Sequence, residues 1–115
     1  MIIQTLKLPA PESGATMLRA LAIGYAKMGR KTLLVLPSQS AWVAFENKFG
    51  LDRDYDVMSA KQALMAWKRG AFSEFDAILV DEIAEAHTSE GNLWDILIHA
   101  SGRSDTVLVG SDTQA

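Results

Sequence analysis

Two adjacent carboxylates stand directly after an apolar run, in a position suited to metal chemistry. Residues 77–80 read Ala-Ile-Leu-Val, and Asp81 and Glu82 follow them. One carboxylate of such a pair can bind a magnesium ion, and the other can activate a water molecule for attack on a phosphate. Two solvated acids at a strand end are the plain alternative, although few strands end in this way by chance. The pair predicts Asp81 as a metal ligand and Glu82 as a catalytic base.

A segment near the N-terminus carries part of a phosphate-binding pattern. Residues 9–16 read Pro-Ala-Pro-Glu-Ser-Gly-Ala-Thr, between a predicted strand and a predicted helix. In the pattern GxxxxGK[ST], backbone N–H groups hold the phosphates, the lysine neutralises them and the hydroxyl holds magnesium. Gly14 and Thr16 match the second glycine and the hydroxyl, whereas Pro9 replaces the first glycine and Ala15 replaces the lysine. An ordinary strand-to-helix turn is the alternative reading of this segment.

The predicted nucleotide contacts are Pro11, Glu12, Ser13, Gly14, Ala15 and Thr16. Thr16 is also predicted as a magnesium ligand, together with Asp81. Two further polar segments follow apolar runs. Residues 36–40 read Leu-Pro-Ser-Gln-Ser, which equally suits a helix N-cap, and residues 109–114 read Val-Gly-Ser-Asp-Thr-Gln, where a γ-phosphate sensor or a simple tail would sit. Because binding sites gather beyond the carboxyl ends of parallel strands, we expect all four segments at one edge of a sheet.

The elements that would position these residues alternate between strands and helices. Unbroken apolar runs at 32–36, 77–80 and 106–109 are typical of strands buried on both faces, and 2–8 and 55–58 are weaker strand candidates. Helical patterns cover 16–28, 40–49, 59–70 and 89–100. This order predicts an α/β fold, a three-layer α/β/α sandwich with a mainly parallel five-stranded sheet. The length of 115 residues predicts a single domain spanning 1–115.

Composition excludes several classes of function. The net charge of -3 argues against coating nucleic acid by bulk electrostatics. The absence of cysteine excludes disulfides, zinc–thiolate sites and thiol nucleophiles. No apolar run approaches the roughly 20 residues of a membrane-spanning helix. We therefore expect a soluble, cytoplasmic protein without a membrane partner.

Read together, these segments resemble the first RecA-like domain of superfamily-one and superfamily-two helicases, within the P-loop NTPases. Residues 10–16 look like motif I, 32–40 like motif Ia, 81–84 like the DExx box of motif II (the Walker B acids), and 109–114 like motif III. The resemblance covers nearly the whole chain. It implies a nucleotide-binding fold with ATP and magnesium as cofactors, with Thr16, Asp81 and Glu82 around the metal ion.

Two departures from the family pattern bear on activity. Ala15 stands where the family has the Walker A lysine, and Arg19, one helical turn beyond, is long enough to reach back, although the plain loss of the cation is the favoured reading. The second RecA lobe is missing, so that another subunit would have to supply an arginine finger. Removing a positive charge that meets the developing phosphate charge costs several kcal/mol, and each ~1.4 kcal/mol is tenfold in rate. The expectation is an ATPase-like fold in which ATP binding is weak or lost.

Three functions stay open from the sequence. The leading hypothesis is a degenerate nucleotide-binding or regulatory protein in DNA metabolism, of a kind that fits a phage or mobile-element gene. A second is an active ATPase, of packaging or helicase type, completed by homo-oligomerisation or a partner subunit. A third is a protein interaction module on the same fold that binds no nucleotide. A thymidine-kinase-like domain, suggested by residues 109–113, is a weaker fourth idea.

Overall fold

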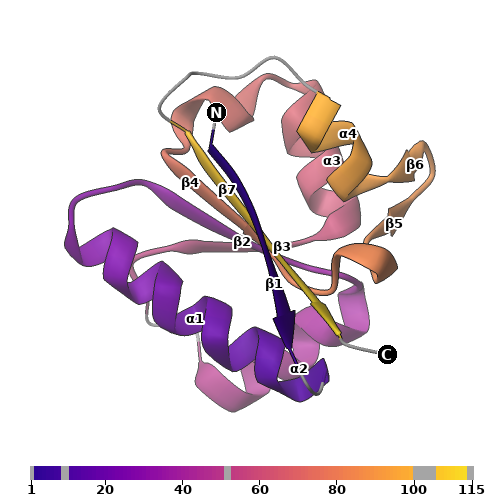
Figure 1. Cartoon of the computed structure of the whole chain (residues 1–115). Coiled ribbons are helices and arrows are strands. Elements are labelled where there is room, and N and C mark those ends of the chain that lie inside the picture. The colour runs from indigo at the N-terminus through magenta and orange to yellow at the C-terminus, as the bar shows by residue number, and fades with distance from the viewer. Residues whose placement is uncertain (1, 9–10, 51–52, 100–105, 114–115) are drawn as a thin grey trace.

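The computed structural model describes residues 2–8, 11–50, 53–99 and 106–113, and these form an α/β domain around a five-stranded parallel sheet (Figure 1). The sheet strands are β1 (Ile2–Leu8), β2 (Thr32–Leu36), β3 (Asp56–Ser59), β4 (Ala77–Val80) and β7 (Val107–Thr113). The helices are α1 (Pro11–Lys27), α2 (Gln39–Phe49), α3 (Ala60–Lys68) and α4 (Leu93–His99). Shorter elements are the 3-10 helices η1 (Ala71–Glu74) and η2 (Ile83–Glu85) and the hairpin strands β5 (His87–Thr88) and β6 (Gly91–Asn92). The predicted α/β class and parallel five-stranded sheet are confirmed.

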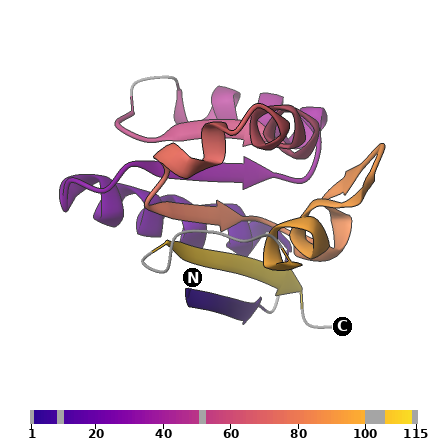
Figure 2. The ribbon, with the colours of Figure 1, turned by 90° about the horizontal axis from the view of Figure 1, so that it is seen from above.

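The order of strands across the sheet is β1-β7-β4-β2-β3, and every neighbouring pair is parallel. In the view from above in Figure 2, the strands follow one another in this order, and their arrowheads all point the same way. The carboxyl ends of all five strands therefore lie at one edge of the sheet. Strand β7, the last in the chain, lies between β1 and β4, so segments that are far apart in sequence meet there.

Helices cover both faces of the sheet, which explains why the central strands are apolar without alternation. In β2, Leu33 and Val35 pack with α3 and α4, whereas Leu34 and Leu36 pack with α1 and α2. All five residues of β2 are buried. Figure 1 shows α1 and α2 on one side of the sheet and α3 and α4 on the other.

Local signals determine several helix ends as the sequence predicts. Ser59 accepts a hydrogen bond from the Gln62 backbone, and the Gln62 side chain accepts one from the Ser59 backbone, which is the expected capping box. Ser38 caps α2 by accepting from the Ala41 N–H. Gly50 ends α2 with a φ of 77°, a conformation that favours glycine.

The start of α1 and the end of β7 differ from the sequence prediction. Helix α1 begins at Pro11 rather than at Thr16, and proline suits a first helical turn because its missing N–H would have no intrahelical partner there. Strand β7 continues to Thr113 rather than stopping at Val109, because it pairs with β1 along its whole length, from Ile2–Val107 to Leu8–Thr113. Two segments predicted as loops are thus partly regular structure.

The predicted helix over 89–100 is shortened by a hairpin. Gly91 has a φ of 116°, which no helix accommodates. It is the first residue of β6 and pairs with Thr88, next to the turn of the β5–β6 hairpin. Asn92 then accepts a hydrogen bond from the Asp95 N–H at 3.2 Å, an N-capping contact that starts α4. Among the described helices, none has the length and apolar character needed to cross a membrane.

Candidate functional site at the carboxyl edge

Asp81, Glu82 and Ser111 meet at the carboxyl edge of the sheet, and we name these three residues the carboxyl-edge cluster. The register pairs Val80 of β4 with Gly110 of β7, so Asp81 and Ser111 are the next residues along two adjacent strands. The Ser111 hydroxyl donates a hydrogen bond of 2.7 Å to Asp81 Oδ1. It also accepts one of 3.1 Å from the backbone N–H of Glu82. One serine thus holds both acidic residues in place.

Asp81 is a buried carboxyl group. Only 5% of its surface is exposed, and its backbone N–H donates to the Val35 carbonyl at 2.8 Å, which ties it to β2. Burial, together with the negative charge of Glu82, raises the pKa of Asp81 from an ordinary 3.8 to about 6. The hydrogen bonds from Ser111 and from the Glu82 backbone oppose this rise in pKa. At neutral pH the carboxylate is ionised. Its burial makes this charged form less stable, and a nearby cation would offset that loss of stability.

Glu82 has a strained backbone. Its φ of 51° and ψ of 64° lie in the left-handed region, and among the described residues it is the only one other than glycine with a positive φ. Holding a residue with a Cβ there costs roughly 1–2 kcal/mol. Such strain persists where the surroundings enforce it, commonly at functional sites. Here the hydrogen bond to Ser111 and the turn into η2 enforce it.

Gly110 allows the turn after β4 to lie close to β7. A Cβ added at this glycine would come within 2.5 Å of Ile83 Cγ2 and 2.8 Å of the Trp94 ring. Ile83 directly follows Glu82, so that any side chain at position 110 would push against the acidic turn. The sequence marked 109–114 as a polar segment but gave neither Gly110 nor Ser111 a specific role. Their roles depend on the pairing of β7 with β4.

The predicted phosphate-loop residues lie in α1. The backbone of Pro11, Glu12, Ser13 and Gly14 is helical, and the side chains of these four lie outside the described residues. Ala15 packs against the core on the α1 side of the sheet, next to Leu18. Thr16 follows Ala15 by about 100° around the helix and is exposed. Between the described side chains of Thr16 and Asp81, the structure has no hydrogen bond.

The basic side chains near α1 are engaged elsewhere. Lys7 Nζ forms an ion pair of 2.9 Å with Asp112, its register partner on β7. The Arg19 guanidinium lies 4.4 Å from the centroid of the Phe49 ring, at the end of α2. Arg19 therefore does not reach back toward Ala15, and the idea that it replaces the missing lysine is wrong.

The donor set suits a shared magnesium ion better than a protein-only metal cage. Among the described residues, no three His, Cys, Asp or Glu side chains gather into a ligand cluster. Magnesium in nucleotide sites is commonly bound by one or two carboxylates together with substrate phosphates and water. Asp81 and Glu82 would fit that role, with Asp81 as the residue that holds the ion. The chemistry that magnesium supplies in such a site is neutralisation of phosphate charge.

The sequence matches no protein-family model and no curated protein. The carboxyl-edge cluster and the fold that assembles it are therefore the basis for assigning a function.

Proposed function

We propose that this chain is a degenerate P-loop NTPase domain of RecA-like, three-layer α/β/α architecture, with a regulatory role in DNA metabolism. In this role it binds magnesium–ATP weakly and does not hydrolyse it alone. The observation that carries the proposal is the pair Asp81 and Glu82 at the end of β4, held by Ser111 from the adjacent strand. The end of β1, which leads into α1, lies one strand further along the same edge.

Asp81 and Glu82 would have different roles in binding magnesium–ATP. Asp81 is buried and hydrogen-bonded, which suits a ligand that must hold one position relative to magnesium. Glu82 is half-buried and follows a strained turn, which suits a group that orients a water molecule. The Asp81 carboxylate would be ionised at neutral pH, since its raised pKa is about 6.

The candidate site has little positive charge where a phosphate would bind. Ala15 supplies no charge, Lys7 is paired with Asp112, and Arg19 lies over Phe49. The first-turn N–H groups of α1 and the helix dipole would then be the main attraction for a phosphate. Losing one donor that meets developing charge reduces a rate by roughly 10²–10³. Binding without turnover is the expected result.

Isothermal titration with ATP in the presence and absence of magnesium tests this function. We expect weak, magnesium-dependent binding that Asp81→Asn removes, and hydrolysis at background level. Asp56→Asn, at an exposed position on β3, is the matched control and should bind as the wild type does. Steady turnover that Glu82→Gln abolishes would contradict the loss of hydrolysis. A specific activity that rises with protein concentration would instead favour an ATPase completed by a second copy or a partner.

A second candidate function is a protein interaction module that binds no nucleotide. It is favoured by one observation, the helical backbone from Pro11 to Thr16, because a helix presents only its first few N–H groups to an anion. A ligand that binds the folded state raises its stability by mass action. A melting temperature unchanged by millimolar ATP, ADP or GTP with magnesium would support the interaction module over nucleotide binding.

A further inference from the structure

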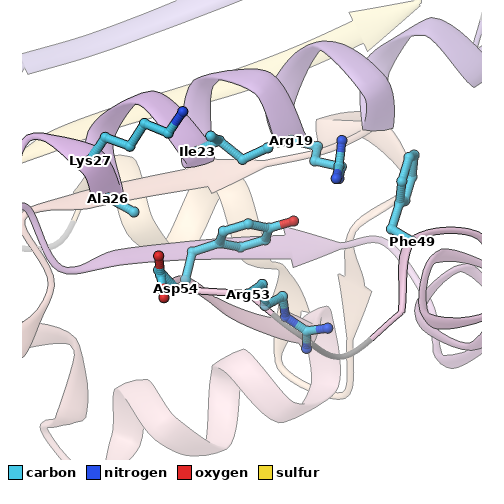
Figure 3. A pocket seen from close by; sticks show the side chains of 8 residues that line it. Arg19, Ile23, Ala26, Lys27, Phe49, Arg53 and Asp54 are labelled. Carbon is cyan, nitrogen blue, oxygen red and sulfur yellow. The ribbon is translucent and has the colours of Figure 1, made fainter.

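A small pocket lies on the α1 side of the molecule, away from the carboxyl-edge cluster. Its volume is about 160 Å³. It is lined by α1, by the end of α2 and by the residues that lead into β3: Arg19, Ile23, Ala26, Lys27, Phe49, Arg53, Asp54 and Tyr55. Helices α1 and α2 both run back from the carboxyl edge, and Tyr55 directly precedes β3. The pocket therefore lies toward the amino ends of the strands, and we name it the amino-edge pocket (Figure 3).

The amino-edge pocket is basic in a chain that is acidic overall. Three cations and one acid line it, whereas the whole chain has a net charge of -3. Arg53 is neutralised by Glu46, whose two carboxylate oxygens lie 2.9 Å and 2.7 Å from its Nη atoms. The Arg53 guanidinium also donates to the Gly50 carbonyl at 3.0 Å. Arg19 and Lys27 then outweigh Asp54, which leaves the pocket with a positive charge.

Arg19 is held in place but keeps a donor without a partner. Its guanidinium lies 4.4 Å from the Phe49 ring centroid, and Phe49 in turn packs on Phe45 at 4.8 Å between ring centroids. The Arg19 Nε is buried and has no hydrogen-bond partner in the described structure. A buried donor without an acceptor is costly, and natural proteins rarely leave one unpaired. Figure 3 shows Arg19 and Phe49 together at one end of the pocket and Lys27 and Asp54 at the other.

We propose that the amino-edge pocket binds the oxyanion group of a small molecule, a phosphate or a carboxylate with a few carbon atoms attached. Arg19 supplies a guanidinium held in place over Phe49, and Lys27 supplies the second positive charge. Ile23, Ala26 and the Tyr55 ring supply an apolar wall for the carbon atoms. The volume is below the roughly 300–1,000 Å³ of pockets for drug-sized ligands, so a whole nucleotide is too large. This site is independent of the nucleotide site proposed above.

Chemical-shift titration of the ¹⁵N-labelled chain with inorganic phosphate and with butyrate, at constant ionic strength, tests the proposal. We expect saturable shifts of the backbone amides of residues 19–27 and 53–55 with at least one probe, at millimolar concentration. Stronger binding of phosphate assigns a phosphate-bearing ligand, and stronger binding of butyrate assigns a carboxylate-bearing one. Sodium chloride is the control for non-specific attraction.

Arg19→Gln should weaken the binding at least tenfold, and Lys27→Gln should weaken it less. Arg30→Gln removes the same charge from an exposed position in the turn after α1, and it should leave binding unchanged. If Arg19→Gln disturbs the fold, its amide spectrum will show this, and the exposed Lys27→Gln variant then decides. The absence of saturable shifts with both probes, equal shifts with chloride, or equal weakening by Arg30→Gln would overturn the proposal.

Discussion

Ser111 and Asp81 lie 30 residues apart in the chain, and the Ser111 hydroxyl donates a 2.7 Å hydrogen bond to the buried Asp81 carboxylate. The contact joins the ends of two adjacent parallel strands, β7 and β4. The same hydroxyl accepts from the Glu82 N–H at 3.1 Å. A single side chain thus links the position of one acid to the backbone conformation of the next, and the first predictions concern this link.

Asp81→Asn should stabilise the protein at pH 8. The pKa of Asp81 rises from 3.8 to about 6 on folding, so the folded state binds more protons between these values and the free energy of unfolding falls as the pH rises through them. The loss of stability caused by ionising the buried Asp81 carboxyl group is complete above pH 6, and it amounts to roughly 3 kcal/mol at most. Urea denaturation between pH 4 and pH 8 should show a flatter profile for the variant. Asp56→Asn, on the exposed start of β3, should keep the wild-type profile, and a variant less stable than wild type at pH 8 would contradict the assignment.

Ser111→Ala should lower stability and raise the pKa of Asp81 above about 6. The substitution removes a donor that favours the ionised carboxylate, and it leaves the Glu82 N–H without this acceptor. A cost of about 1–3 kcal/mol is expected for such buried groups. Carboxyl ¹³C titration of Asp81 and chemical denaturation measure the two effects. Ser40→Ala, at an exposed position in α2, should change neither, and an unshifted Asp81 titration in Ser111→Ala would contradict the role of the hydroxyl.

Glu82→Gly should be more stable than Glu82→Ala by about 1 kcal/mol, because both remove the carboxylate but only glycine is unstrained at a φ of 51°. Chemical denaturation of both variants measures the difference. The matched pair is Glu85→Gly and Glu85→Ala in η2, where the order should reverse because Glu85 has no positive φ. Equal stabilities of the two Glu82 variants would show that the turn relaxes without cost.

Gly110→Ala should destabilise the protein by about 1–3 kcal/mol, because the added methyl group would overlap Ile83 and the Trp94 ring. Gly24→Ala is the matched control, since nothing lies within 4 Å of a Cβ at that position in α1. The helix preference of alanine should make Gly24→Ala more stable by up to ~1 kcal/mol. Thermal unfolding distinguishes the two, and a Gly110→Ala variant as stable as wild type would show that Ile83 and Trp94 move aside without cost.

The strands and helices could be predicted from patterns among residues that are close together in the sequence. The runs at 32–36 and 77–80 match β2 and β4, because a strand buried on both faces must be apolar at every position. The capping box at Ser59 was predictable because its partners are three residues apart. These signals require only neighbouring residues, so they can be seen before the fold is known.

The features that shape the two candidate sites depend on contacts between distant residues. The extension of β7 to Thr113 follows from its pairing with β1, about a hundred residues earlier. Gly110 and Ser111 have their roles because β7 lies beside β4. Whether Arg19 turned toward Ala15 or toward Phe49 depended on where the end of α2 lies.

The sequence alone was therefore sufficient to predict the class of fold and the acids at the end of β4. Both depend on neighbouring residues, the fold class on apolar periodicity and the acids on residue type. The tertiary structure decided which residues surround those acids and which cations stay apart from them. The physical reason is that hydrogen bonds and ion pairs act over a few ångströms in space, whatever the separation along the chain, so they exist only once the strands have been ordered.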